Sequence, residues 1–291
     1  MIKKIPNIEF KQGKLPEVGF EIIELASLYK RIAQGKAGSA DKPHRVNFHN
    51  LILYTQGTGQ HFVDFRTFPV EKNSVVFVQK GQVHAFDVTN KPQGKMILFT
   101  ETYLQKVLSA IDIQILPPTH FLASYRPNYS IKETTQLTLQ HLLTVISNEY
   151  QTTEPNIAFL QVLFAALITK VEGERPAIYH QQLSSFHLQC FQRFIALLQI
   201  DFVKKLDAQA YAHNIGTSYK TLNKICKLAT NMTAKQLIDA YTILEAKRRL
   251  LIENMQVQQL AFLLGFDEAT NFVKYFKKHT LMTPSQFKKS H

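Results

Sequence analysis

The spacing of hydrophobic residues changes near residue 100, from a pattern typical of strands to one typical of helices. Residues 18–100 contain short segments rich in β-branched and aromatic residues, such as HFVDFRTFPV and SVVFVQ, separated by closely spaced turn signals. Many short strands in succession predict a β-barrel or a double-sheet roll. After Thr100 the apolar residues recur at helical spacing, as at Leu139, Leu143 and Ile146. The chain is therefore predicted to have an α+β fold.

One predicted helix, NIAFLQVLFAALITKV, is apolar on nearly all of its sides. Pro155 is predicted to start it, because the fixed φ of proline suits a first helical turn. A helix that is apolar all round must be covered by more than its own domain, and the simplest cover is a second copy of the chain. We therefore predict a symmetric dimer with Leu163 and Leu167 in the seam, and a helix end at Gly173 and Pro176.

The C-terminal segment contains an internal repeat. TNMTAKQL at 230–237 and TLMTPSQF at 280–287 share Thr, Met, Thr and Gln at an offset of 50. The same offset pairs Leu222 with Phe272, Lys224 with Lys274, Cys226 with Phe276, and Lys227 with Lys277. Because the apolar and the charged positions both recur, we interpret the segment as two copies of one unit.

Each copy is predicted to be a helix-turn-helix, at about 207–230 and about 257–280. The turns match after a one-residue shift, as Ala212…Gly216 and Ala261…Gly265. The second helix of such a unit enters the major groove of DNA. We expect this helix to be capped by Thr217 or Ser218 in the first copy and by Asp267 in the second.

The helix that is predicted to connect the two copies, at about 234–254, has a length close to one turn of DNA. At about 1.5 Å per residue it spans roughly 30 Å. This is close to the ~34 Å of one DNA turn, so two recognition helices could reach successive major grooves on one face of the duplex.

Charge and composition support this interpretation. Residues 184–291 contain 15 Lys and Arg against 7 Asp and Glu, and the whole 291-residue chain has a net charge of +12. A basic segment beside a nearly balanced one suggests a polyanionic partner. Cys190 and Cys226 fit neither a zinc motif nor a disulfide framework and are expected to be buried thiols of a reducing cytoplasm. No apolar run is long enough to predict a membrane span, and no signal peptide is predicted.

Residues 184–291 resemble the DNA-binding domain of AraC/XylS-type regulators, through LAFLLGF, NFVKYFKKHT and TPSQF. The resemblance implies contacts with DNA by two sets of residues. They are Ser218, Lys220, Asn223, Lys224 and Lys227 in the first copy, and Thr270, Asn271, Lys274, Lys277 and Lys278 in the second. Lys227, Lys277 and Lys278 are expected at phosphates. The family usually has Gly where this chain has Asn231 and Leu281. A branched Leu tolerates a left-handed backbone poorly, so either Leu281 is strained or its turn is built differently.

The N-terminal half resembles the cupin-like sensor of the same regulators, through PHRVNFHNLILYTQGTG and PVEKNSVVFVQKGQVH. Cupin metal enzymes use an H-x-H pair, a Glu and a later His. Here His44 and His84 match two of these positions, but Val46 and Asn50 replace the others, which makes a poor metal site. We predict no cofactor and no metal. The candidate effector-binding residues are His44, His49, Tyr54, His84 and Phe86, and a barrel filled by its own side chains is the alternative.

These patterns predict four parts: a cupin-like β-barrel sensor at 1–100, a helical dimerisation segment at 101–172, a linker at 173–183, and an all-α domain with two helix-turn-helix motifs at 184–291. The predicted function is a bacterial, cytoplasmic, homodimeric regulator that binds double-stranded DNA and a small-molecule effector. RNA polymerase is the expected further partner, and we expect a regulator rather than an enzyme. The sequence leaves both an activator and a repressor open. The alternatives are a cupin metalloenzyme fused to a DNA-targeting module and a regulator controlled by a protein partner.

Overall fold

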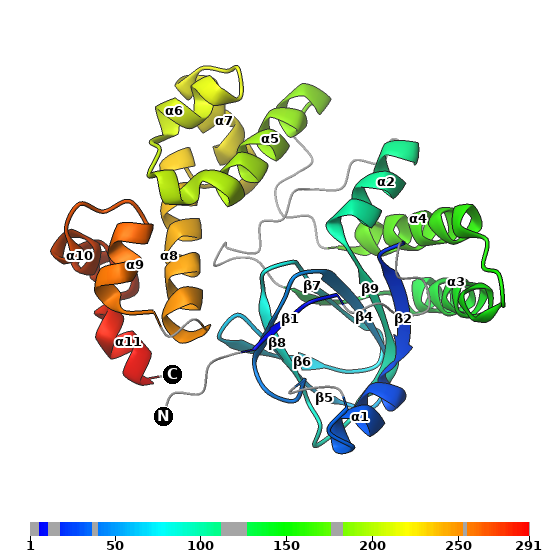
Figure 1. Ribbon diagram of the computed structural model, residues 1–291. Coiled ribbons are helices and arrows are strands. Elements are labelled where there is room, and N and C mark those ends of the chain that lie inside the picture. The colour runs from blue at the N-terminus through cyan, green and yellow to red at the C-terminus, as the bar shows by residue number, and fades with distance from the viewer. Residues whose placement is uncertain are drawn as a thin grey trace. The chain divides into compact units, whose positions relative to one another are not determined.

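A computed structural model describes residues 6–10, 18–36, 40–111, 127–175, 183–252 and 255–290 (Figure 1). The described chain forms two compact units, one N-terminal to residue 176 and one from residue 183 onward. The first unit is mixed and the second is helical, which confirms the predicted α+β fold class. No helix within the described ranges is long and apolar enough to cross a membrane.

The N-terminal unit contains two five-stranded sheets with the strand orders β1-β3-β8-β5-β6 and β10-β7-β4-β9-β2. Apart from β1 and β3, which are parallel, the paired strands are antiparallel. The strands are β1 (Asn7–Ile8), β2 (Phe20–Glu24), β3 (His44–Val46), β4 (His49–Gln56), β5 (Gly59–Val63), β6 (Arg66–Val70), β7 (Ser74–Val78), β8 (Val83–Phe86), β9 (Gln93–Phe99) and β10 (Asn128–Ser130). The sequence did not predict β10, which lies beyond residue 100 and completes the second sheet beside β7.

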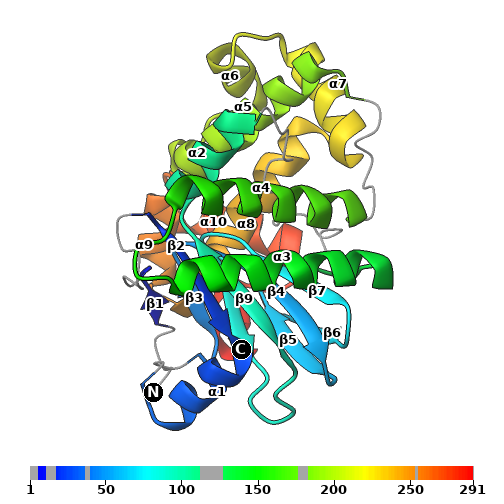
Figure 2. The same cartoon turned by 90° about the vertical axis from the view of Figure 1, so that its right-hand side faces the viewer.

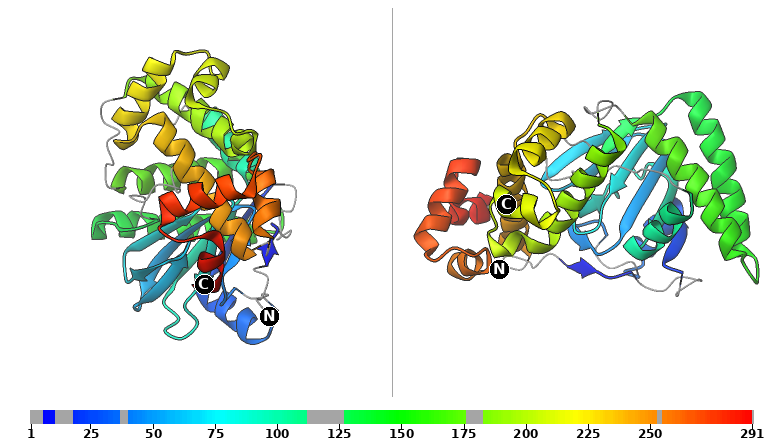
Figure 3. Two further views of the ribbon diagram at one scale, coloured as in Figure 1. Left: turned by 90° about the vertical axis from the view of Figure 1, so that its left-hand side faces the viewer. Right: turned by 90° about the horizontal axis from the view of Figure 1, so that it is seen from above.

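Four helices accompany these sheets: α1 (Leu25–Ala33), α2 (Glu101–Ile111), α3 (Glu133–Gln151) and α4 (Ile157–Glu174). Helices α3 and α4 lie side by side across one face of the second sheet (Figure 2; Figure 3, right). Leu51 and Leu53 of β4 pack into this helical layer, whereas Ile52 and Tyr54 point into the core between the two sheets. The alternation along β4 therefore separates an inner core from an outer one.

The boundaries of α4 differ from the prediction at both ends. Asn156 is the N-cap and accepts a hydrogen bond from the Phe159 backbone N–H at 3.0 Å, so Pro155 lies outside the helix. An asparagine in this position satisfies an otherwise unpaired amide, which proline cannot do. At the other end, Gly173 does not stop the helix, which continues to Glu174.

The burial of α4 also differs from the prediction. Leu167 is fully buried, together with Leu160 and Phe164, in the outer core of its own unit. Leu163 packs against the same core and is partly buried. The sheet thus covers much of the apolar surface that we assigned to a second copy of the chain. Leu167 cannot lie in a seam between two copies.

The C-terminal unit is helical throughout its described residues. Its elements are α5 (Ser185–Asp201), the 3₁₀ turn η2 (Phe202–Lys204), α6 (Ala208–Asn214), α7 (Tyr219–Thr230), α8 (Ala234–Ile252), α9 (Val257–Leu263), α10 (Ala269–Thr280) and α11 (Pro284–Ser290). Helix α8 connects the α6–α7 pair to the α9–α10 pair and packs on α6, α7, α9 and α11 (Figure 1). Cys190 and Cys226 are both buried free thiols, as predicted.

The structure confirms the internal repeat. Helix α7 at 219–230 and helix α10 at 269–280 have the same length at an offset of 50. The offset also holds for single hydrogen bonds: the Thr230 hydroxyl donates to the Cys226 carbonyl, and the Thr280 hydroxyl donates to the Phe276 carbonyl, each at 2.8 Å. The residues that follow both helices form equivalent turns, so one local design was used twice.

The caps of the two recognition helices are not equivalent. Ser218 caps α7, since its hydroxyl accepts from the Thr221 backbone N–H at 3.1 Å, which confirms one of the two predicted residues. The prediction of Asp267 for α10 was wrong. Glu268 is the N-cap residue there, and its side chain accepts from the Thr270 hydroxyl at 3.0 Å instead of from a backbone N–H.

Leu281 has the left-handed conformation that the sequence made doubtful. Its φ is 63°, close to the 59° of Asn231 at the equivalent position. The turn is therefore built like its counterpart, and the strain of a branched residue with positive φ is present. The Leu281 side chain is 86% exposed, so packing does not compensate for the strain.

Candidate nucleic-acid interface and sensor core

The second recognition helix, α10, exposes a continuous polar stripe. All five residues predicted there, Thr270, Asn271, Lys274, Lys277 and Lys278, are exposed. The opposite face is apolar, with Phe272 and Phe276 fully buried. Since a helix turns about 100° per residue, the five exposed residues fall within one third of its circumference. The stripe carries amide, hydroxyl and ammonium groups, which bind base edges and phosphates.

The Gly-Phe turn before α10 places this stripe. Gly265 has a φ of 74°, which favours glycine, and its missing Cβ would lie only 3.0 Å from the Val203 carbonyl oxygen. Phe266 follows the turn and packs on Phe272 and Tyr275 of α10. The Tyr275 hydroxyl donates to the Asp239 carboxylate of α8 at 3.0 Å. Helix α10 is thereby fixed both to the turn after α9 and to α8.

The first recognition helix, α7, exposes a different set of groups. Lys220, Lys224 and Lys227 are exposed and occupy positions equivalent to Thr270, Lys274 and Lys277. Ser218 is exposed as well, but its hydroxyl serves as the helix cap.

Asn223 has a structural role that the sequence prediction missed. Its side-chain oxygen accepts from the Ala234 backbone N–H at 3.0 Å, at the first turn of α8. The position equivalent to Asn223 in the second copy is Val273, and the position equivalent to Ala234 is Pro284. Proline has no N–H to satisfy, and there the acceptor is replaced by an apolar residue. This paired exchange, visible in the sequence, indicates that Asn223 supports α8.

A polar network crosses the interior of the N-terminal unit between its two sheets. The Tyr54 hydroxyl lies 3.0 Å from Nδ1 of His61, whose Nε2 lies 3.1 Å from Nδ1 of His84. Nε2 of His84 lies 3.0 Å from Nδ2 of Asn50. The His44 ring lies 4.4 Å from that of His84, between centroids. All five side chains are buried.

Burial determines the charge of this network. It lowers the pKa of His61 to about 3 and that of His84 well below its usual value, and the nearby His44 lowers both further. The pKa of Tyr54 is raised, again mainly by burial. The histidines are therefore neutral at physiological pH, and each ring offers both a donor and an acceptor. Asn50 Oδ1 is buried without a hydrogen-bond partner among the described residues.

The structure separates His49 from the other candidate effector-binding residues. His44, Tyr54, His84 and Phe86 are together in the inner core, where Phe86 packs against the ring of His84. His49 lies on the opposite face of β4, stacked on Phe99, and its Nε2 is 2.8 Å from a carboxylate oxygen of Glu101. This contact is the largest cause of the lowered pKa of Glu101, about 2.

Comparison with known proteins identifies the family of the chain. A family model described as the AraC-like ligand binding domain matches residues 30–168, and another described as a helix-turn-helix domain matches residues 211–290. The chain belongs to the AraC family of transcriptional regulators. It therefore combines a ligand-binding domain with a DNA-binding helix-turn-helix domain.

Individual relatives are distant but similar over most of their length. The HTH-type transcriptional activator RhaS of Klebsiella pneumoniae is 20% identical over 247 residues, and RhaS of Escherichia coli O6:H1 is 22% identical over 250 residues. Each alignment covers 84% of this chain and 87% of the relative. The crystal structure of ToxT from Vibrio cholerae O395 covers 84% of this chain and 89% of its own, at 14% identity and a TM-score of 0.43.

In this AraC-family regulator, two members of the sensor network were missed by the sequence prediction. His61 precedes the buried Val63 by two positions on β5, so strand alternation places both on the inner face. Asn50 was considered only as a replacement for a metal-binding Glu. Its contact with His84 joins residues 34 positions apart, which no local pattern reveals.

Proposed function

We propose that this protein binds specific DNA through the exposed stripes of α7 and α10, placed in two successive major grooves. The observation that carries the proposal is the duplicated recognition helix, with lysines exposed at equivalent positions, such as Lys224 and Lys274. Neither of the two lysines makes a hydrogen bond or an ion pair with another described residue, so both ammonium groups are available to DNA. Lys277 and Lys278 extend the stripe toward phosphates.

Binding of the protein to the DNA upstream of its own gene tests this proposal. The wild-type protein should prefer that duplex over a scrambled duplex of equal length. A variant with Lys224→Ala and Lys274→Ala should lose affinity, whereas Lys72→Ala, at an exposed ion pair of the N-terminal unit, should not. Equal wild-type binding to both duplexes would contradict sequence-specific recognition.

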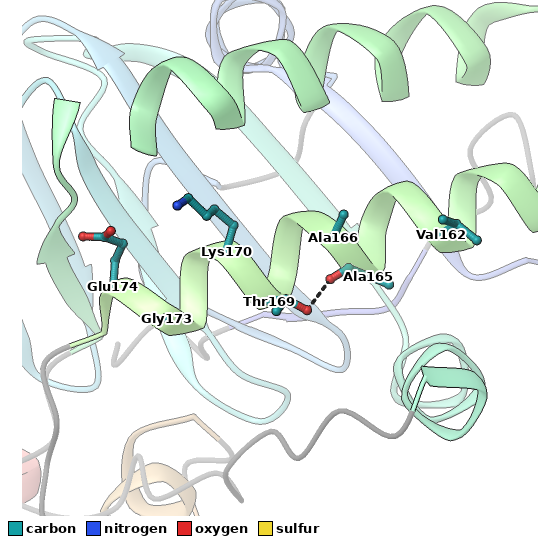
Figure 4. A pocket seen from close by; sticks show the side chains of 7 residues that line it. All are labelled: Val162, Ala165, Ala166, Thr169, Lys170, Gly173 and Glu174. Atoms are coloured by element: carbon teal, nitrogen blue, oxygen red, sulfur yellow. Dashed lines mark hydrogen bonds between the residues drawn. The ribbon is translucent and has the colours of Figure 1, made fainter. Parts of the chain in front are cut away.

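We propose a homodimer that forms through the outer face of α4. Phe159 and Val162 remain 42% and 62% exposed there, and the exposed Ala166 continues the stripe. A groove of about 480 Å³ follows this face and is lined by Val162, Ala165, Ala166, Thr169, Lys170, Gly173 and Glu174 (Figure 4). A face of small and apolar residues allows a second helix to approach closely, and a two-fold axis would pair it with itself.

Sedimentation of the full chain at micromolar concentration tests the dimer. Val162→Glu adds a charge at the exposed stripe and should shift the protein to a monomer. Thr67→Glu, at an exposed position of β6, is the control and should leave the dimer intact. A wild-type monomer would contradict the proposal, and so would a dimer that tolerates Val162→Glu.

For effector control, the support comes from the network of His44, Asn50, Tyr54, His61 and His84, with Phe86 beside it. Its neutral rings and the unpaired Asn50 oxygen favour an uncharged ligand with hydrogen-bonding groups. Mass spectrometry of ligands retained after mild purification tests this, together with their effect on DNA affinity. A retained small molecule that changes DNA affinity would support effector control. A protein partner that changes it without any small molecule would favour the alternative.

The remaining expectations concern enzymatic activity, partners and location. Among the described residues, no three His, Cys, Asp or Glu side chains are grouped so that they could hold a metal ion. We propose a regulator that is not an enzyme, and stoichiometric iron, manganese or zinc in the purified protein would overturn this. RhaS is named an activator, and this name supports the proposal that the present protein is also an activator. We propose further that it acts with RNA polymerase in the cytoplasm.

A further inference from the structure

Neither recognition helix contains an arginine. The sequences are YKTLNKICKLAT for α7 and ATNFVKYFKKHT for α10. Arginine or lysine can donate two hydrogen bonds to guanine, whereas asparagine reads adenine with one donor and one acceptor. Lysine carries its charge on a flexible stem, so its contact with guanine is less fixed in geometry than that of the planar arginine group. Reading of adenine by these helices, with a paired donor and acceptor, therefore depends on their amides, Asn223 and Asn271.

The two amides are in different states. Asn223 lies off the lysine stripe of α7, and its oxygen is occupied by the Ala234 N–H. An amide whose acceptor is taken cannot make the paired donor and acceptor contacts that adenine requires. Asn271 is exposed on the stripe of α10, and its side chain has no hydrogen bond with any residue in the described ranges.

The position equivalent to Asn271 in α7 is Thr221, and it does not compensate. Its hydroxyl lies 2.9 Å from the Ser218 hydroxyl, next to the helix cap. The exposed stripe of α7 then consists of Lys220, Lys224 and Lys227, whose ammonium groups only donate. Donor-only groups on flexible stems bind phosphates of any sequence, and among the bases they suit the acceptors of guanine and do not pair with the donor and acceptor of adenine.

We propose that the two helix-turn-helix units divide recognition: α10 reads the base sequence, with Asn271 on an adenine, and α7 holds the DNA backbone by charge. This inference rests on the proposed placement of both helices in major grooves. It adds that the sequence preference is one-sided, with little information in the groove that α7 occupies.

Selection of DNA by the full-length protein from a random-sequence duplex pool tests the division. We expect one half-site with a strongly preferred A·T pair and a second region, about one helical turn away, with weak preference. Equally strong preferences in both half-sites would overturn the division while leaving DNA reading intact. Failure to enrich any sequence would instead overturn the proposed function itself, and the inference with it.

Two variants assign the half-sites. Asn271→Ala should remove the preference at the A·T pair and reduce the ratio of specific to scrambled binding about 10-fold or more. Lys224→Ala should weaken binding to selected and scrambled duplexes by the same factor and leave the selected sequence unchanged. If Lys224→Ala changed the preferred bases and Asn271→Ala did not, α7 would be the reader and the proposal would be wrong.

Discussion

The two recognition helices and the turns that follow them share one backbone pattern and present different chemistry. In these turns the backbone N–H groups of Asn231 and Leu281 each donate, at 2.8 Å, to the carbonyl four residues earlier. The exposed stripes differ, with lysines on α7 and mixed amide, hydroxyl and ammonium groups on α10. Positions required by the fold were kept in both copies, and positions open to solvent diverged.

The buried positions differ in a second way. The core of the second copy is aromatic. It contains Phe272 and Phe276 at the positions where the first copy has the smaller Leu222 and Cys226. Ring contacts continue from Phe276 to Phe287 of α11. The second unit thus depends on a few large side chains. The first is also covered by α5, which packs on α7.

The largest expected difference concerns these cores. Phe276→Ala should destabilise the helical unit by about 3–5 kcal/mol, because it leaves a cavity at a fully buried position. Cys226→Ala removes one heavy atom and should cost about 1 kcal/mol, within the range for deletion of a single core group. Amide hydrogen exchange of the most protected helical residues measures both. Equal costs would mean that the two cores are equally important for stability.

The salt dependence of binding should distinguish contacts with bases from contacts with phosphates. Lys277→Ala should weaken binding to all duplexes and reduce the slope of log K against log salt by about 1, since one phosphate contact is lost. Asn271→Ala should cost on the order of 1–3 kcal/mol at one base position and leave the slope nearly unchanged. Binding to a specific and a scrambled duplex at several salt concentrations gives both values. Reversed effects would mean that α10 is oriented differently in the groove.

The pairing of Asn223 with Ala234 can be tested by giving the first copy the residues of the second, Val273 and Pro284, at these two positions. Asn223→Val leaves the Ala234 N–H unpaired and should lower stability by about 0.5–2 kcal/mol, as for a lost helix cap. Adding Ala234→Pro removes that N–H at a position where proline suits a helix start, and should restore most of the loss. Thermal unfolding of the two single variants and the double variant measures the coupling. Additive losses would disprove the assigned pairing.

The smallest expected effect is at the left-handed turns. Leu281→Asn should stabilise the protein by about 0.5–1 kcal/mol, because asparagine tolerates positive φ and the exposed Leu281 loses no packing. Asn231→Leu should destabilise the first copy by a similar amount. Chemical denaturation of both variants checks the pair. Opposite signs would show that the exposed leucine makes a stabilising contact.

Local periodicity was sufficient to predict the helical unit from sequence, because its essential contacts lie within short segments. The repeat and the Gly265 turn follow from residue spacing, and spacing narrowed the cap of α7 to Thr217 or Ser218. The contact of Asn223 with Ala234 could also have been predicted, because the repeat has Pro284 where the first copy has Ala234. The family resemblance instead assigned Asn223 to a contact with DNA bases. Asp267 was wrong because adjacent acidic residues leave the register of a cap undetermined.

The sensor was less predictable, because its contacts join distant strands. Leu167 looked available to a partner since the sequence does not show that a sheet covers α4. His49 was grouped with Tyr54 although the two lie on opposite faces of β4, five residues apart. The network through His61 depends on strand pairing between sheets, which periodicity along one segment does not determine.

Methylation interference on the DNA bound by the full-length protein most directly tests the placement of both recognition helices in one duplex. Methyl groups on guanine N7 obstruct the major groove, so they should block binding where α7 or α10 lies. If both helices lie in successive major grooves, two clusters of interference are expected on the same face of the duplex, centred about 10 base pairs apart. A single cluster, or two clusters on opposite faces, would contradict this placement.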